Sequence, residues 1–461
     1  MSDIAQAAAL KKTGTFFGEP KALAYLAFTE AWERFSYYGM TALLVLYMTE
    51  ALFLPGHVEH IAGFAAFRAG IESIFGPMSP VALASQIYGL YTGFVYFTPV
   101  FGGWIADRWM GRRNAVVAGA ILMSGGHIAM AFDQSFLLAL VLLITGCGLL
   151  KGNISTQVGQ LYAEDDAAGR TRGYSIFSMG INVGATVGPL ACGLLAQIYG
   201  WHAGFGLAGI LMLIGLATYL AGYRTLTEET PAANRTSDAP LKLGAKEWRV
   251  IAALVVAMAL TVPQSVAYYQ NSSIGLVWIN AHVNLDVFGF RIPTPWFNSI
   301  DPFISIVFVP VLIALWGWQD RHGGEPDEVM KIAQGAFMAA VANFLLVIGS
   351  WLFHPVPAIF PILYDVLLGI AFLYYWPPLL ALVSRAAPTG LKATLLGAAF
   401  LALFVGNIIV GWVGTFYERM TPANFWALEG GIAVAGGVVA FVLARPLMRV
   451  LAVPAKVSGA G

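Results

Sequence analysis

The sequence is poor in charged residues, and this scarcity decides the class of protein. Only 11% of its 461 residues are Asp, Glu, Lys or Arg, whereas 58% are hydrophobic, and the mean hydropathy is +0.72. A soluble domain of this composition would not stay dispersed in water, so we predict an all-α integral membrane protein. The formal net charge is zero, which argues against a nucleic-acid partner.

Residues that usually carry catalysis or bind metals are also scarce. The two cysteines, Cys147 and Cys192, each lie in an apolar segment, and we interpret them as packing residues. The chain has no nucleophile beside a base, no metal-ligand spacing and no phosphate-binding loop, and its histidines are interpreted as solvated or packed. We therefore predict that it is not an enzyme and that it needs no cofactor. Its N-terminus lacks the order of a cleaved signal peptide.

Long apolar windows predict twelve membrane-spanning helices. They cover residues 22–52, 81–106, 113–132, 134–162, 172–199, 204–223, 248–272, 296–318, 331–353, 358–385, 391–417 and 425–447. The polar segment 225–247 links the sixth span to the seventh. We expect an N-terminal six-helix bundle at 1–224, a cytoplasmic linker at 225–247 and a C-terminal six-helix bundle at 248–461. The long outer loop from His57 to Ser79 is predicted to form an amphipathic surface helix.

The basic residues orient these spans. With the N-terminus in the cytoplasm, Arg68, Arg291 and Arg419 fall on the outer side, and Arg34 and Lys151 lie within spans. The other 20 of the 25 Lys and Arg residues fall on the cytoplasmic side, as the positive-inside rule predicts. We therefore expect both termini in the cytoplasm. We also expect a monomeric, multi-pass protein of a bacterial-type inner (plasma) membrane.

Three charged residues interrupt the first span. Glu30, Glu33 and Arg34 lie between the apolar stretches KALAYLAFT and MTALLVLYM, which together are long enough to cross a bilayer. Each charge would cost roughly 2.5–3.5 kcal/mol at the centre of a membrane helix, so the three should face the protein interior or water and find partners. By helical periodicity Glu30, Arg34 and Tyr37 fall on one stripe of the helix.

The fourth span carries a lysine in mid-membrane, Lys151, which needs an anion. We expect Glu30 or Glu33 to supply it while Arg34 takes the other carboxylate. Two acids and two bases balance to zero, so a proton added to a glutamate leaves a positive charge that must rearrange its partners. We interpret the cluster as a proton switch that frees Lys151 or Arg34 for an anionic substrate group. The alternative is a static network that holds spans one and four together.

Other polar residues within the spans are candidates for the same site. Asn182 in the fifth span is either a ligand contact or a link between helices. Tyr96 in the second span either lines a binding site or packs. Asp301 opens the eighth span and Asp365 lies near the start of the tenth, where each is either functional or a solvated carboxylate.

The segment from Glu30 to Gly39, EAWERFSYYG, closely resembles the signature of the proton-dependent oligopeptide transporter family, within the major facilitator superfamily. Residues 102–108, 148–154 and 177–184 resemble the family too, and the resemblance is thinner in the second half. It implies a major facilitator fold of 12 transmembrane helices in two six-helix bundles. It also implies symport of di- and tripeptides, with the proton as coupling ion.

The resemblance implies roles for individual residues. The positions that match the proton-coupling motif are Glu30, Glu33, Arg34 and Lys151. The positions that match substrate-binding residues are Arg34, Tyr37, Tyr38, Tyr96, Lys151 and Asn182.

The sequence departs from the family at three positions. Thr41 stands where an arginine is usual and Tyr268 where a glutamate is usual, so both ends of an ion pair at the outer gate are missing. Their joint loss is coherent because a lone buried charge is far less stable than none. Leu373 or a neighbour stands where a glutamate usually receives the peptide amino group. We hypothesise that Asp301, or otherwise Asp365, replaces a lost carboxylate in gating or amine recognition.

We therefore predict a symporter that uses the proton gradient to import short peptides by alternating access. The expected partners are the peptide, protons and the lipid bilayer. One alternative is a proton-coupled transporter of a non-peptide or peptide-like anion, and a second is a drug/proton antiporter. A third is a membrane sensor or scaffold that transports nothing.

Overall fold

Helices occupy all twelve predicted spans, the seventh as shorter pieces, in the computed structural model, which describes residues 15–451 except 17, 164–165, 227–242 and 389. Within this described part, nine helices meet the length and hydropathy of a membrane span. The helical membrane fold is therefore confirmed. Most of the predicted linker at 225–247 and both chain ends lie outside the described residues.

The described residues of the first half contain six long helices and one helix on the surface. Their bounds are α2 (Lys21–Tyr47), α3 (Phe64–Phe75), α4 (Pro80–Ile105), α5 (Arg112–Ala129), α6 (Phe136–Gln160), α7 (Ala167–Tyr199) and α8 (Trp201–Gly222). Short helical turns are η1 (Met48–Leu52), η2 (Val58–His60), η3 (Ala106–Met110), η4 (Asp133–Ser135) and η5 (Tyr223–Thr225), and β1 (Thr15–Phe16) pairs antiparallel with β2 (Glu19–Pro20). α3 is the surface helix predicted for the outer loop.

The second half begins with a broken span. Its helices are α9 (Ala245–Leu260), α10 (Val262–Tyr269), α11 (Ile274–His282), α12 (Ile300–His322), α13 (Glu328–Leu352), α14 (Ile359–Ala386), α15 (Lys392–Gly414) and α16 (Pro422–Leu451). Short turns are η7 (Gln270–Ser272), η8 (Thr294–Ser299) and η9 (Tyr417–Arg419). β3 (Val283–Asn284) pairs parallel with β6 (Val356–Pro357), and β4 (Asp286–Val287) pairs antiparallel with β5 (Phe290–Arg291).

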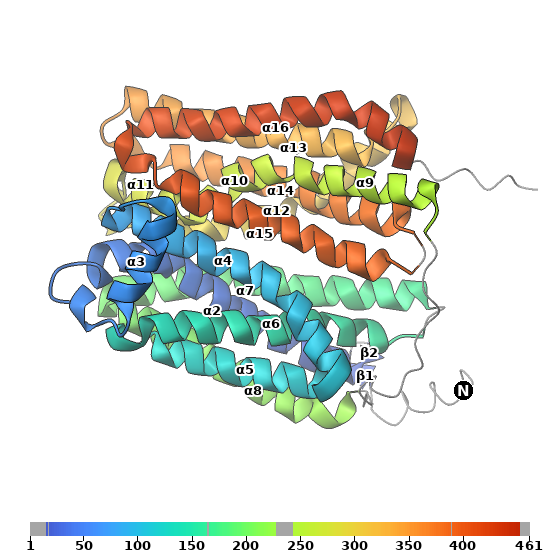
Figure 1. Ribbon diagram of the computed structural model, residues 1–461, viewed down its shortest axis with the longest axis horizontal. Coiled ribbons are helices and arrows are strands. Elements are labelled where there is room, and N and C mark those ends of the chain that lie inside the picture. The colour runs from blue at the N-terminus through green and yellow to red at the C-terminus, as the bar shows by residue number, and fades with distance from the viewer. Residues whose placement is uncertain (1–14, 17, 164–165, 227–242, 389, 452–461) are drawn as a thin grey trace, which may run out of the picture.

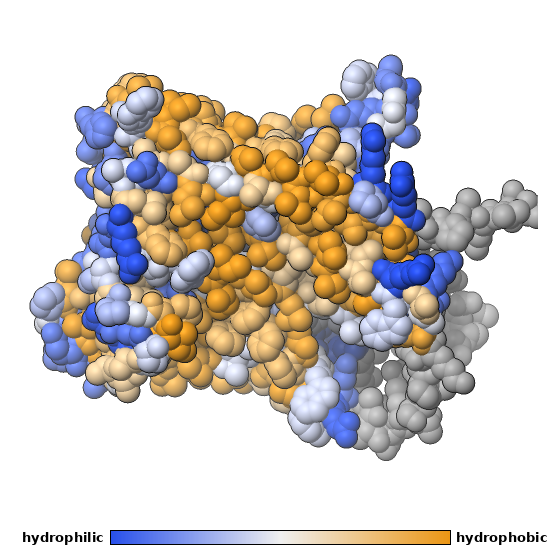
Figure 2. Space-filling view, turned by 45° about the horizontal axis from the view of Figure 1, so that its top comes forward, coloured by the Kyte–Doolittle hydropathy of each residue, from blue (hydrophilic) through white to orange (hydrophobic). Residues whose placement is uncertain are grey.

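The long helices run side by side along the longest axis of the molecule (Figure 1). Figure 2 shows apolar side chains gathered in a broad band between two ends rich in hydrophilic residues. A bilayer requires this distribution, because its core cannot hydrate polar groups. We call the end that carries α3 the outer end, following the predicted orientation, and the opposite end the cytoplasmic end.

Glycines let the helices of the first half approach closely. A Cβ on Gly184 of α7 would lie 2.4 Å from the Ala31 carbonyl oxygen of α2. A Cβ on Gly102 of α4 would lie 2.0 Å from the Gly148 carbonyl oxygen of α6. Small residues at such contacts are typical of membrane helices, whose association depends on close packing. These contacts hold α2 and α6, the two helices that carry the predicted charged cluster.

The seventh span differs from the single helix expected at 248–272. It is divided into α9, α10, η7 and α11, and it continues to His282. Pro263 lies in the first turn of α10, where its missing N–H cannot bond to the turn before it. Ser273 then adopts a non-helical backbone between η7 and α11. The span therefore consists of segments that are not one rigid rod.

The buried apolar residues separate into groups that follow the two halves. One group draws its buried members from Ala22 to Leu226, and the others draw theirs from Ala253 to Leu451. The halves meet where α4 packs on α15, and a Cβ on Gly89 would lie 2.5 Å from the Asn407 carbonyl oxygen.

Hydrogen bonds join the halves at the outer end. Asn280 of α11 donates to Glu50 of η1, and Ser79 donates to Glu418 of η9. Further bonds run from the Trp296 indole to the Leu190 carbonyl (2.9 Å), from the Gln197 amide to the Arg291 carbonyl (3.0 Å) and between the hydroxyls of Ser85 and Ser273 (3.1 Å). The two halves are therefore in contact at the outer end in this structure.

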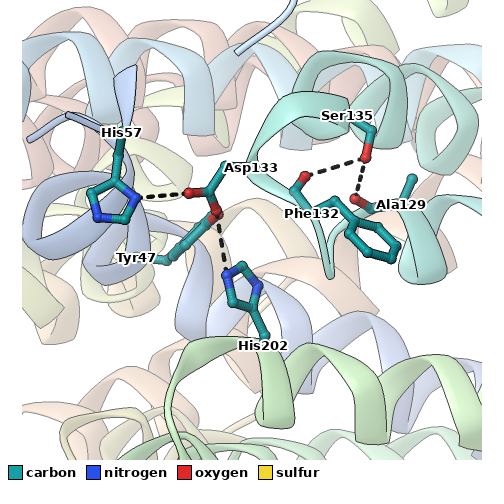
Figure 3. Close-up of polar contacts among 7 residues, drawn as sticks. All are labelled: Tyr47, His57, Ala129, Phe132, Asp133, Ser135 and His202. Atoms are coloured by element: carbon teal, nitrogen blue, oxygen red, sulfur yellow. Dashed lines mark hydrogen bonds and ion pairs between the residues drawn. The ribbon is translucent and has the colours of Figure 1, made fainter. Parts of the chain in front are cut away.

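Two histidines, interpreted from the sequence as solvated or packed, share one carboxylate at the outer end (Figure 3). His57 Nδ1 lies 2.8 Å from Asp133 Oδ2, and His202 Nε2 lies 3.4 Å from Asp133 Oδ1. The Tyr47 hydroxyl, at the end of α2, donates to the same carboxylate. Asp133 thus joins the outer ends of α2, α6 and α8.

Replacing Gly102 by Ala should destabilise the protein, because the added methyl would collide with the backbone of α6. We expect a loss of about 1–3 kcal/mol in unfolding free energy, measured as a lower melting temperature in detergent. The adjacent Gly103 is a matched control, since a Cβ there meets nothing within 4 Å. Equal melting temperatures for Gly102→Ala and Gly103→Ala would contradict the packing.

Candidate functional site

One guanidinium holds both glutamates of the first span. Arg34 Nε lies 3.2 Å from Glu30 Oε1 and also bonds to Glu33 Oε2. All three side chains come from α2, and their residues are 3%, 0% and 2% exposed for Glu30, Glu33 and Arg34. Residues four apart on a helix face the same side, which brings Glu30 to Arg34. The cluster points into the protein rather than at lipid.

This cluster has unused capacity for a ligand. Glu30 Oε2, Glu33 Oε1 and Arg34 Nη2 are buried without hydrogen-bond partners. A free carboxylate oxygen can accept a proton, and a free guanidinium nitrogen can bind a carboxylate. The site can therefore take up a proton and an anionic group at neighbouring positions.

The expected ion pair between Lys151 and a glutamate is not formed. In the described residues no carboxylate lies within 4 Å of the Lys151 ammonium group. Its nitrogen lies 4.3 Å from the centre of the Tyr96 ring, and the residue is only partly buried. Both glutamates instead use the cation on their own helix, because Arg34 is adjacent in sequence to Glu33 and one turn from Glu30. Lys151 is therefore left without a carboxylate counter-ion among the residues that the structure describes.

Tyrosines cover the space between the two cations. The Tyr37 ring lies 5.2 Å from the Arg34 guanidinium carbon and stacks on Tyr91 at 6.4 Å. Tyr38 is partly buried and packs edge-on against Tyr37. The Tyr96 hydroxyl lies 3.2 Å from that of Tyr269 in α10. This last contact joins the first half to the second beside Lys151.

Asn182 lies on α7 and is partly buried. Its amide donates to the Ser178 carbonyl one turn earlier at 3.0 Å, so this bond stays within its own helix. Both cysteines are buried and free, and a Cβ on Gly39 of α2 would lie 2.5 Å from Cys192 Sγ.

The three family departures have separate structural outcomes. The Thr41 hydroxyl bonds to the backbone of its own helix, at the Tyr37 and Tyr38 carbonyls. The Tyr268 hydroxyl donates to Asp301 Oδ2 in α12, and Asp301 is only 8% exposed. Leu373 packs with Leu312 and Tyr374 in a small apolar group. The positions of the missing gate glutamate and Asp301 are therefore in direct contact.

Two further acids are buried in the second half. Asp365 of α14 is 1% exposed, so it is not the solvated carboxylate that was the alternative for it. Glu429 of α16 is 0% exposed and accepts a hydrogen bond from Gln270 at 2.8 Å. The sequence analysis missed Glu429, although a single acid within the apolar window 425–447 was the available signal.

The comparison with protein families decides the identity. A model described as the POT family matches residues 113–240 and 241–427, which together make up more than half of the chain. The chain belongs to the POT family. This confirms the resemblance inferred from the segment at 30–39, which precedes the matched ranges. Members of the POT family are transporters, so the chain is a transporter rather than an enzyme.

Curated relatives match this POT family member along almost its whole length. A di-/tripeptide transporter of Lactococcus lactis subsp. cremoris is 27% identical, with 96% of this chain and 98% of the relative covered. A peptide transporter of Yersinia enterocolitica is 28% identical, with 95% and 96% covered. An uncharacterised transporter of Bacillus subtilis is also 28% identical, with 95% and 96% covered.

Solved structures share the fold. A crystal structure of a peptide transporter POT in complex with sulfate superposes with a TM-score of 0.84 at 27% identity and covers 98% of this chain and 99% of that chain. A mutant of a peptide transporter POT in complex with alafosfalin gives a TM-score of 0.83 at 27% identity, with the same coverage. The predicted major facilitator fold is thereby confirmed.

Removing the shared cation should unfold the site. Arg34→Ala leaves two buried carboxylates unpaired, and we expect a loss of about 3–5 kcal/mol in stability, read as a large fall in melting temperature. Adding Glu30→Gln and Glu33→Gln to this variant should restore most of the loss, because no buried charge then remains. Arg68→Ala, which breaks a partly exposed pair with Glu72 on α3, is the control and should change stability by about 0–1 kcal/mol. A wild-type melting temperature for Arg34→Ala would contradict the shared ion pair.

Proposed function

We propose that this POT family member is a proton-coupled symporter that imports di- and tripeptides by alternating access. The relatives named as di-/tripeptide and peptide transporters support this substrate class, as does the solved peptide transporter that holds alafosfalin. We also propose that it acts as a monomer in a bacterial inner membrane, with both termini in the cytoplasm. The positive-inside distribution supports this orientation.

The observation that carries the proposal is the division of charge between Arg34 and Lys151. Arg34 holds two carboxylates, so that group carries one negative charge, and the unpaired Lys151 carries one positive charge. The site is balanced when it is empty. A proton alone or a substrate carboxylate alone would leave a net charge in a buried place, whereas both together keep the balance. Proton and peptide are therefore taken up as a pair.

The residues have distinct roles in this scheme. Glu30 and Glu33 accept the proton on their free oxygens. Protonation loosens their hold on Arg34, which then binds the peptide carboxylate together with Lys151. Tyr37, Tyr38, Tyr96 and Asn182 are proposed to contact the peptide. A net charge moved inward with the substrate would gain about 2.3 kcal/mol per 100 mV.

Alternating access follows from the contacts between the halves. We propose that residues 1–224 and 248–461 form two bundles, joined by the linker at 225–247, that rock around the site between them. The outer-end hydrogen bonds of Asn280 and Trp296 support a state closed to the outside. The Tyr96–Tyr269 contact lies beside Lys151, where both bundles would meet a bound peptide.

The peptide amino group is proposed to bind Asp301. This carboxylate is buried in the second half, opposite the cations of the first half, and Tyr268 already donates one hydrogen bond to it. A dipolar peptide would then span the interface, with its carboxylate at Lys151 and its amine at Asp301. Asp365, the other carboxylate considered from the sequence, is given no part in binding the amine, because the phenol contact that would orient a carboxylate is found at Asp301.

Uptake into proteoliposomes tests the function. Di-alanine accumulation that requires an inward proton gradient supports the peptide symporter. Proton-driven uptake of other anions, but not of peptides, would favour the anion transporter. Proton-driven efflux of drugs would favour the antiporter, and a chain with no flux for any solute would be a sensor or scaffold.

Lys151→Ala should weaken the uptake of di-alanine, because the peptide carboxylate loses one of its two cations. A charge-assisted hydrogen bond contributes about 1.5–3 kcal/mol, so we expect KM to rise roughly tenfold to a hundredfold. Lys151→Arg keeps the charge and should lose less. Lys246→Ala, at the exposed start of α9, is the control. An unchanged KM for Lys151→Ala would remove this residue from the binding site.

Asp301→Asn should impair uptake of di-alanine and alter its pH dependence. If Asp301 binds the amine, KM rises about tenfold or more for the free peptide but not for N-acetylated di-alanine, which carries no amine. Tyr268→Phe retains the carboxylate and should have a smaller effect. Equal KM values and pH profiles for wild type and Asp301→Asn would refute the assignment.

A further inference from the structure

Two buried acids in the outer part of the second half are left over from the proposed site. Asp365 of α14 has no hydrogen-bond partner on either carboxylate oxygen. Glu429 of α16 uses Oε1 to accept from Gln270 Nε2, and its Oε2 has no partner. They are 1% and 0% exposed, respectively. A buried carboxylate whose oxygens lack hydrogen-bond donors and a cation is a site for a ligand rather than a packing group.

Unpaired hydrogen-bond donors surround the same place. The Trp426 ring lies 5.7 Å from the Tyr364 ring and 5.6 Å from the Trp278 ring. The Tyr364 hydroxyl and the indole N–H groups of Trp278 and Trp426 are all buried without partners. Trp426 precedes Glu429 by three residues on α16, and Tyr364 is adjacent to Asp365. Open donors beside open acceptors indicate a place that admits water and protons.

No basic side chain neutralises these acids in the part of the chain that the structure describes. The ionisable groups on neighbouring elements are Asp301, Tyr364, Tyr417 and His282. Asp301 of α12 accepts a hydrogen bond from Tyr268, and the His282 ring of α11 lies 6.4 Å from the Trp278 ring. Asn343 of α13 and Asn407 of α15 are uncharged. The outer-end arginines, Arg291 and Arg419, are exposed. An enclosed carboxylate in such surroundings is stable only when it carries a proton.

Both acids face the break in the seventh span. Gln270 of η7 donates a hydrogen bond to Glu429. The Asn271 side chain lies near Asp365 but does not form a hydrogen bond with it. Just beyond η7, Ser273 bonds to Ser85 of α4 in the other half. Farther along, Asn280 of α11 bonds to Glu50. The segment that contacts the two acids is thus one of those through which the second half contacts the first at the outer end.

We propose that Asp365 and Glu429 form a second proton-binding site, which takes its protons from the outer side and must be protonated before the outer end closes. When the outer end is open, water can reach the carboxylates and they can ionise. Closure buries them around η7, and ionised acids without a cation would oppose that burial. Each acid takes up one proton, and no other bond is made or broken. The site is separate from Glu30 and Glu33 and does not touch the peptide.

The transport test uses the full chain in proteoliposomes, and it rests on the proposed function. External pH is varied at constant internal pH while the initial uptake of di-alanine is measured. The double variant Asp365→Asn, Glu429→Gln mimics the protonated acids. The external pH at which uptake falls to half of its maximum on the alkaline side should therefore be higher than in wild type by about one pH unit or more. The control Asp286→Asn removes an exposed carboxylate from the same half and should follow wild type. An unshifted midpoint would overturn the proposal.

Infrared spectroscopy tests proton binding without any substrate, so it separates this inference from the proposed function. The wild-type protein should show a protonated-carboxyl band that is lost in the double variant and kept in Asp286→Asn. If the double variant does not fold, Asp365→Asn and Glu429→Gln are compared singly, and each should lose part of the band. A spectrum that neither substitution changes would overturn the proposal, even for a protein that transports peptides.

Discussion

The structure depends on one buried interaction, in which a single guanidinium on α2 serves two carboxylates of the same helix. Arg34 pairs with Glu30 and Glu33 within one turn of α2. The cluster therefore carries a single net negative charge without any partner from another helix. The remaining positive charge, Lys151, comes from α6. Its position is set by the glycine contacts that bring α4 onto α6, and that of α2 by Gly184 of α7. Small residues at helix contacts therefore determine where the charges lie.

The two halves have different electrostatics. The first half buries acids and bases together, whereas the acids buried in the described part of the second half have only neutral partners: a phenol for Asp301 and an amide for Glu429. Neutral donors hold an ionised carboxylate less firmly than a guanidinium does. Changes in protonation are therefore expected in both halves, whereas the proposed site for the peptide carboxylate lies in the first, at Arg34 and Lys151. The phenols of Tyr96 and Tyr269 connect the two environments.

Hydropathy predicted the spans well because a bilayer imposes the same length and apolarity on each helix. The break in the seventh span was missed, because Pro263 lies within an apolar window that hydropathy alone cannot divide. The partner of Lys151 was predicted wrongly, since a count of charges says nothing of distance and both glutamates had a closer cation on their own helix. The meeting of His57 and His202 at Asp133 depends on three segments far apart in sequence. No local pattern could have indicated it.

The substitutions at the outer gate have a physical consequence for coupling. An arginine and a glutamate, as is usual in the family, would close the gate as a neutral pair without any proton. In this chain Thr41 bonds to its own backbone, and Tyr268 brings a phenol to Asp301, so the gate lacks the cation that would neutralise its acids. Burial of Asp365 and Glu429 then requires protons instead of an arginine. Loss of the ion pair therefore makes closure of the outer end depend on protons, which is consistent with a transporter driven by an inward proton gradient.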